Sequence, residues 1–236
     1  MECIPMSINE KSFSVFYSAH PENQYPETWK GKNPIKWFQN VTEASCKRDA
    51  LNAAGPEAMD RGRLFEFCAN PTVEAMDIFV AVCAWGGMRV DHGRRAWPLA
   101  NIWGPAIDEL KANCLSNREA YGLFDHIRGE GGLSGVGPAY FTKFIFFVRP
   151  DLGGYIMDQW TERSINLLYG TTIKLIRGKD GQYVGKNSPE IYEDFCRKIE
   201  DVSGRLNITP EKAEIALFSN GGKRPGAWRK YVKCHA

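Results

Sequence analysis

A glycine-rich segment followed by one acidic residue is the part of the sequence whose residue types could do chemistry. The segment 133–139 reads Leu-Ser-Gly-Val-Gly-Pro-Ala, and Asp158 follows 19 residues after Ala139. Glycines before a helix leave backbone N–H groups accessible, and the positive end of that helix favours a bound phosphate. Asp158 stands where a helix would begin, so its side chain can cap that helix, and the helix end favours its ionised form. The turn therefore suggests contact with a nucleic-acid backbone, and the acid is a candidate for chemistry.

Helices are the elements that must position these residues. Ser116 and Glu119 form a capping box for a helix that ends at Gly129. Pro138 begins a second helix, which we expect to run to about Val148. The sequence therefore predicts a helix-hairpin-helix at 117–148.

Further capping signals predict a mainly α protein with a minor β-hairpin. Asp158 is expected to begin a helix to about Leu168, after an extended segment 155–157. Alternating residues from Ile173 to Val184, with a turn at 180–181, predict the β-hairpin. Other predicted helices start at Asn70-Pro71 and end at Gly86, or start at Pro105, Ser188-Pro189 and Thr209-Pro210.

The length of 236 residues, with 43% hydrophobic and 25% charged residues, favours a single globular unit over residues 1–236. Within it we expect an N-terminal arm and first helices at 1–69, a core at 70–170, and a β-hairpin with packed C-terminal helices at 171–236. The apolar stretches are too short for a membrane span, and the N-terminus lacks a secretory signal pattern, so we expect a cytoplasmic protein without membrane association.

The cysteine spacing and the distribution of charge indicate which ligands the chain could bind. The seven cysteines lack metal-ligand spacing, so we expect reduced thiols, with Cys68 and Cys83 buried, and no zinc or iron-sulfur site. The net charge is only +2, but the tail 221–236 carries five Lys and Arg residues and no acid. This tail could contact phosphates.

These motifs resemble the helix-hairpin-helix DNA glycosylase superfamily. Its hairpin reads Leu-Pro-Gly-Val-Gly and is followed about twenty residues later by a catalytic Asp. The segments 141–144 (Phe-Thr-Lys-Phe) and 157–160 (Met-Asp-Gln-Trp) are most similar to a bacterial branch with an 8-oxoguanine-glycosylase-like fold. That branch includes enzymes that attack hypermodified cytosine in phage DNA. The resemblance is strongest over 117–169.

The resemblance implies that Asp158 is catalytic. Bifunctional members carry lysine two residues after the second hairpin glycine, where this chain has Ala139. Hydrolysis is then the economical mechanism, and the product is an abasic site in an intact strand. Lys143 lies one helical turn after Ala139 and could be a catalytic amine, a phosphate contact or a surface residue.

The resemblance also implies contacts with double-stranded DNA, from which a base must be flipped. Main-chain contacts would come from the hairpin, and an inserted residue from the loop after the helix that ends at Gly86, whose Trp85 is assigned to the core. The candidate DNA-binding residues are Gly135, Val136, Gly137, Ala139, Met88, Arg89, His92, Gln159 and Trp160. Superfamily hairpins also bind a monovalent cation, which would contact the carbonyl groups of Leu133, Gly135 and Val136 as a structural K⁺ or Na⁺.

The resulting hypothesis is a monofunctional, monomeric DNA glycosylase that requires no cofactor. Its expected substrate is a glucosylated hydroxymethyl cytosine of phage DNA, in antiviral defence. One alternative is an 8-oxoguanine DNA glycosylase of base excision repair. Another is a helix-hairpin-helix module that binds DNA without catalysis.

Overall fold

The computed structural model describes residues 6–20, 29–43, 48–55, 57–112, 114–170, 173–177, 183–185, 187–219 and 226–236. The chain divides into two compact units. Residues 29–154 form the central unit, and 1–28 with 155–236 form the terminal unit. These boundaries differ from the expected divisions after 69 and 170, because the first helix packs with the last ones.

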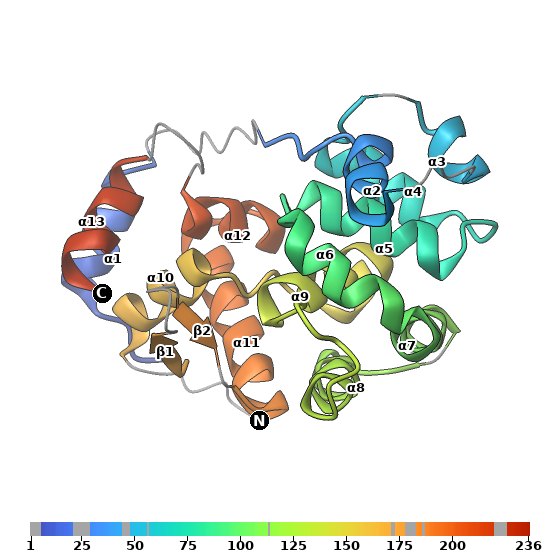
Figure 1. Cartoon of the computed structure of the whole chain (residues 1–236). Helices are drawn as coiled ribbons and strands as arrows, with labels where there is room; N and C mark the ends of the chain where they lie inside the picture. Colours follow the sequence, from blue (N-terminus) through green and yellow to red (C-terminus); the bar gives the residue numbers. More distant parts are fainter. Residues whose placement is uncertain are drawn as a thin grey trace. The chain divides into compact units, whose positions relative to one another are not determined.

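The central unit is helical (Figure 1). Its core contains α5 (Ala75–Trp85) and α9 (Pro138–Val148), in which nearly every residue is buried. The rings of Phe79 and Trp103 stack at 3.9 Å between centroids, and Phe144 packs on Phe79 at 5.7 Å. Its other elements are α2 (Pro34–Thr42), α3 (Asp49–Ala53), α4 (Arg61–Ala69), α6 (Val90–Ala96), η2 (Trp97–Leu99), α7 (Ala100–Ala112), α8 (Asn117–Gly129) and η3 (Pro150–Leu152).

The helix-hairpin-helix begins and ends as predicted. Ser116 and Glu119 form the capping box of α8, and Pro138 is the first residue of α9. Two other predicted starts are wrong. Asn70 closes a turn by accepting the Thr72 N–H at 3.0 Å, so α5 begins only at Ala75. Pro105 lies inside α7, which starts at Ala100.

The terminal unit is also helical. In its core the Trp228 indole donates to the Ser164 hydroxyl at 2.9 Å, and Phe16 packs edge-on against Trp228 at 4.9 Å. This contact explains why the N-terminal helix belongs to the unit of the C-terminal helices. The helices are α1 (Glu10–Ser18), α10 (Gln159–Tyr169), α11 (Pro189–Leu206), α12 (Pro210–Phe218) and α13 (Ala227–His235). The mainly α class and the starts at Pro189 and Pro210 are confirmed.

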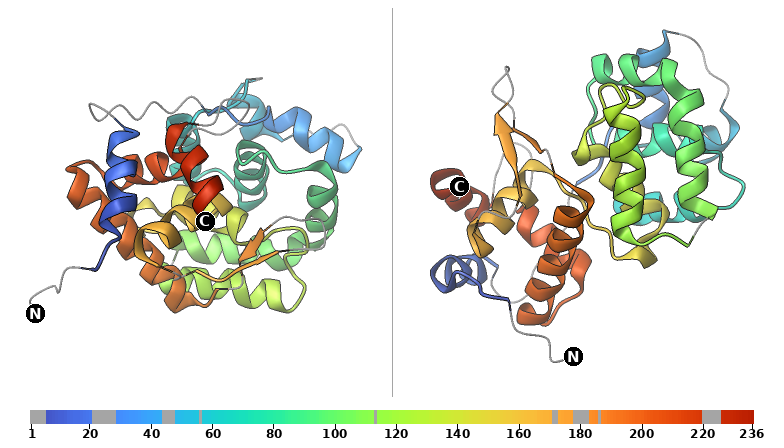
Figure 2. Two further views of the ribbon diagram at one scale, coloured as in Figure 1. Left: turned by 90° about the vertical axis from the view of Figure 1, so that its left-hand side faces the viewer. Right: turned by 90° about the horizontal axis from the view of Figure 1, so that it is seen from below.

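Two short strands accompany the helices of the terminal unit. Strands β1 (Leu175–Arg177) and β2 (Tyr183–Gly185) pair antiparallel, with Ile176 opposite Val184 (Figure 2). The predicted turn at 180–181 lies outside the described residues.

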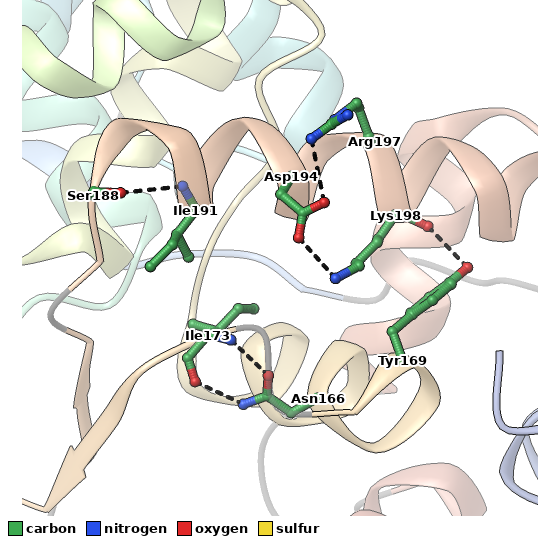
Figure 3. A network of polar contacts seen from close by, with 8 residues as sticks. All are labelled: Asn166, Tyr169, Ile173, Ser188, Ile191, Asp194, Arg197 and Lys198. Atoms are coloured by element: carbon green, nitrogen blue, oxygen red, sulfur yellow. Dashed lines mark hydrogen bonds and ion pairs between the residues drawn. The ribbon is translucent and has the colours of Figure 1, made fainter. Parts of the chain in front are cut away.

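Polar contacts hold α10 in place within the terminal unit (Figure 3). The Asn166 amide donates to the Ile173 carbonyl at 3.1 Å and accepts the Ile173 N–H at 2.8 Å. The Tyr169 hydroxyl contacts the Lys198 carbonyl of α11 at 3.4 Å, and the Lys198 ammonium donates to Asp194 at 2.7 Å. These bonds fix the C-terminal half of the helix that begins after Asp158.

Three described cysteines are buried, namely Cys68, Cys83 and Cys196. Burial raises the pKa of each of these thiols, to about 12 for Cys196. The predicted burial of Cys68 and Cys83 is therefore confirmed, and these thiols stay protonated at neutral pH.

Candidate active site

The hairpin of the central unit is held by its apolar side chains. Leu133 and Val136 are each only 1% exposed. The Val136 N–H donates to the Leu133 carbonyl at 2.9 Å, and Gly135 has a φ of +85°, as the third residue of a type II turn requires. Leu133 and Val136 therefore anchor the turn in the core, and any contact of Val136 with DNA would have to come from its main chain.

The main chain of the hairpin retains donors for a ligand. Within the described chain, no hydrogen bond starts at the N–H groups of Gly135, Gly137 or Ala139. A Cβ atom on Gly137 would meet no atom within 4 Å, whereas one on Gly135 would lie 2.7 Å from the His92 carbonyl oxygen. Amide donors at a helix N-terminus suit an anion such as a phosphate. The hairpin therefore presents backbone donors of the kind that bind a phosphate, and its contact with DNA stays a prediction.

The candidates for insertion into DNA that follow α5 differ in their burial. Met88 is fully buried, and its carbonyl accepts the Lys32 ammonium at 2.7 Å and the Trp37 indole at 2.8 Å. The Met88 side chain therefore belongs to the core in this structure, and its contact with DNA stays a prediction. Trp85, at 4% exposure, is confirmed as a core residue.

Arg89 and His92 stay candidates. Arg89 has an exposed side chain that pairs with Asp91 at 2.9 Å. His92 is half-buried, and its backbone lies against Gly135 of the hairpin. Burial, with help from the positive charge of Arg95, lowers the pKa of His92, so its imidazole is neutral at pH 7. The N-cap and first turn of α6 thus present one cation, Arg89, and one neutral ring, His92.

Lys143 is not a surface lysine. It is 7% exposed, its aliphatic stem lies next to Gly86, and its ammonium donates to the Ala139 carbonyl. Its nitrogen also lies 5.3 Å from the centre of the Tyr140 ring. The contact with Ala139 joins Lys143 to the position at which bifunctional glycosylases carry lysine.

Asp158 caps α10 in the terminal unit, as the sequence predicts. Its Oδ1 atom accepts the N–H groups of Trp160 at 2.7 Å and Thr161 at 3.1 Å. The Thr161 hydroxyl completes the capping box by accepting the Asp158 N–H at 3.0 Å. Asp158 is half-buried, and no hydrogen bond among the described residues reaches its Oδ2 atom. One carboxylate oxygen is thus fixed and the other stays available.

Glu162 is a second carboxyl group beside Asp158, and sequence reasoning missed it. It lies one turn further along α10 and is 3% exposed. Burial, reinforced by the charge of Asp158, raises the pKa of Glu162 to about 9, so it is a neutral acid at pH 7. The spacing of four residues from Asp158 was the signal for proximity, but its burial could not be read from the sequence.

The two residues that follow Asp158 differ in their surroundings. Gln159 is exposed, whereas Trp160 is half-buried between side chains of α10 and α13. The Arg229 guanidinium lies 4.5 Å from the centre of the Trp160 ring. The basic residues at 223 and 224 of the predicted phosphate-binding tail lie outside the described residues.

The described residues provide no cluster of three or more His, Cys, Asp or Glu side chains that could hold a metal ion. For the predicted monovalent cation, the Leu133 carbonyl already accepts the Val136 N–H, and the His92 imidazole is hydrogen-bonded to the backbone of Gly135. A cation at the carbonyl groups of this turn stays a prediction. No described helix is long and apolar enough to span a membrane.

Comparison with known proteins gives one match. The family model described as "Putative 8-oxoguanine DNA glycosylase OGG-like protein" matches residues 18–218, which is more than four fifths of the chain. No curated protein and no solved structure shows a significant match. The match includes the hairpin of the central unit, Asp158, and all of α10.

Proposed function

The chain belongs to this OGG-like family, whose description supports a DNA glycosylase function, and on that premise we propose that it is a monofunctional DNA glycosylase. It would flip a modified base out of double-stranded DNA and hydrolyse the N-glycosidic bond. The observation that carries the proposal is the Asp158 cap, in which Oδ1 is fixed by two amides while Oδ2 accepts no bond from the described residues.

Asp158 has the role of the catalytic carboxylate. When the base departs, positive charge develops on the sugar, and a carboxylate held in one orientation stabilises it without reorganisation. The same group orients or deprotonates the attacking water. Glu162 is neutral at pH 7 and adds no negative charge beside Asp158. The proposal assigns hydrolysis to the terminal unit and strand binding to the hairpin of the central unit.

Residue 139 supports hydrolysis over covalent catalysis. An alanine side chain has no amine to attack the sugar, and the Lys143 ammonium is engaged by the Ala139 carbonyl. The product is then an abasic site in an intact strand. The carbonyl groups of Leu133, Gly135 and Val136 would hold a monovalent cation, which supplies positive charge near the bound strand.

The proposed substrate is a glucosylated hydroxymethyl cytosine of phage DNA, excised in the cytoplasm in antiviral defence. The motifs at 141–144 and 157–160 support it by their resemblance to the branch that includes such enzymes. A second candidate is 8-oxoguanine, which is the base named in the description of the family. Neither substrate requires an added cofactor in this mechanism.

Replacement of Asp158 tests the proposal. Duplexes that carry glucosylated hydroxymethyl cytosine or 8-oxoguanine are incubated with the protein, and released bases are identified by mass spectrometry. Asp158→Asn should keep the helix cap, because Asn caps as well as Asp, and should lower the rate of base release about 100-fold or more. Asp60→Asn is the matched control, since Asp60 caps α4 by accepting the Arg63 N–H at 2.9 Å.

Three results would contradict the proposal in different ways. Undiminished release by Asp158→Asn would remove Asp158 from its role. A borohydride-trapped adduct that is lost in Lys143→Ala would replace hydrolysis by amine catalysis. Absence of release from every modified DNA, with DNA binding retained, would favour the non-catalytic module.

A further inference from the structure

Three cations gather around one indole ring in the terminal unit. The Arg229 and Arg163 guanidinium carbons lie 4.5 Å and 5.2 Å from the centre of the Trp160 ring, and the Lys233 nitrogen lies 5.6 Å from it. All three distances are within cation–π range. Trp160 and Arg163 belong to α10, whereas Arg229 and Lys233 are one turn apart on α13. We call these four residues the Trp160 cluster.

The Trp160 cluster carries excess positive charge. Burial lowers the pKa of Arg229, and the negative charge of Asp158 acts in the opposite direction. The other acid on this part of α10 is Glu162, which is protonated at pH 7 because burial and the charge of Asp158 raise its pKa to about 9. The cluster therefore holds three cations around one ring, and only Arg229 is shown to interact with the charge of Asp158, so the cluster attracts an anion.

One cation of the cluster is fixed and another is exposed. Arg229 is 6% exposed, donates from Nε to the Phe218 carbonyl at 3.0 Å, and lies between the rings of Phe218 and Trp160. Lys233 is exposed on α13. The Arg229 guanidinium is already held in place, so ligand binding would cost it little conformational entropy, and the Lys233 side chain is free to reach a ligand.

We propose that Trp160, Arg229 and Lys233 form a binding site for a DNA backbone phosphate close to the nucleotide on which Asp158 acts. The proposal rests on the glycosylase function proposed above, because Asp158 directly precedes α10. A single strand carries one phosphate charge about every 3.4 Å of helix axis, so a group that reaches one sugar lies near a phosphate. A bare carboxylate would be repelled by that phosphate, and the cluster offsets this repulsion.

The salt dependence of DNA binding tests the proposal. The probe is a duplex with a tetrahydrofuran abasic analogue, which cannot be turned over, and affinity is measured by fluorescence anisotropy from 50 to 200 mM salt. Loss of one phosphate contact should reduce the slope of log K against log salt by about 0.9. Lys233→Gln should then bind about 15-fold more weakly at 50 mM and about fourfold more weakly at 200 mM.

Lys212→Gln is the matched control, because Lys212 is an exposed lysine of the same unit on α12. It should leave the slope unchanged. An unaltered slope in Lys233→Gln, or an equal reduction in Lys212→Gln, would overturn the proposal. The readout is independent of base release. If Asp158→Asn kept full base release while Lys233→Gln reduced the salt slope of DNA binding, the proposed catalytic role would fail and the phosphate site would stand.

Discussion

Glu162→Gln should change how the stability of the protein depends on pH. In the unfolded chain this carboxyl loses its proton near pH 4.5, whereas burial keeps it protonated in the native protein up to about pH 9. Unfolding therefore releases a proton between these two values. Because the native state binds more protons, the free energy of unfolding falls as pH rises through this window.

The size of the effect follows from the pKa. Inside the window each pH unit changes the free energy of unfolding by about 1.4 kcal/mol, so the wild-type protein should lose about 2.7 kcal/mol from this group between pH 6 and pH 8. Gln has the same shape and no proton to lose. The Tm of Glu162→Gln relative to wild type should therefore rise by about 5–10 °C over those two pH units.

Thermal unfolding followed by circular dichroism at pH 5, 6, 7 and 8 measures this difference. Glu66→Gln, which replaces an exposed carboxylate on α4, is the control and should differ from wild type by a constant amount at every pH. A Tm difference for Glu162→Gln that is also constant over pH 5–8 would refute the reasoning, because it would mean that Glu162 is ionised in the native protein at neutral pH.

The remaining predictions concern the central unit. Gly135→Ala should destabilise the protein by about 1–3 kcal/mol and weaken DNA binding, because φ is +85° and the new Cβ would lie 2.7 Å from the His92 carbonyl oxygen. Gly137→Ala adds a Cβ in open space and should change stability, measured by urea unfolding, by less than about 1 kcal/mol. Met88→Ala should lower the free energy of unfolding by about 2–5 kcal/mol and leave the affinity of the folded protein for DNA unchanged. A lower affinity would support a contact between Met88 and DNA.

Helix starts that depend on neighbouring residues were predictable from the sequence. The capping box of Ser116 with Glu119, the helix start at Pro138 and the cap at Asp158 all form where expected. Each involves bonds between residues two to four positions apart, so the local sequence contains both partners. Such motifs were sufficient to predict the helix-hairpin-helix and the start of the helix that follows Asp158.

The errors came where one local signal fits two structures. Proline suits the first turn of a helix but also occurs within a longer one, so Pro105 was misplaced as a start. Asn70 can cap a helix or close a turn, and here its side chain bonds Thr72. The burial of Met88 could not be read from its place in the sequence, because it depends on contacts with distant residues such as Trp37.

The sequence by itself determined the helical class, the glycine turn and the acid that caps α10, because those features form between neighbours in the chain. Only the tertiary structure decided the protonation of Glu162 and the grouping of Arg229 and Lys233 around Trp160. These properties depend on burial and on contacts between residues about 70 positions apart, since α10 and α13 meet only after the chain has folded. Electrostatic free energy depends on distance and solvent exposure, and neither can be read from the order of residues.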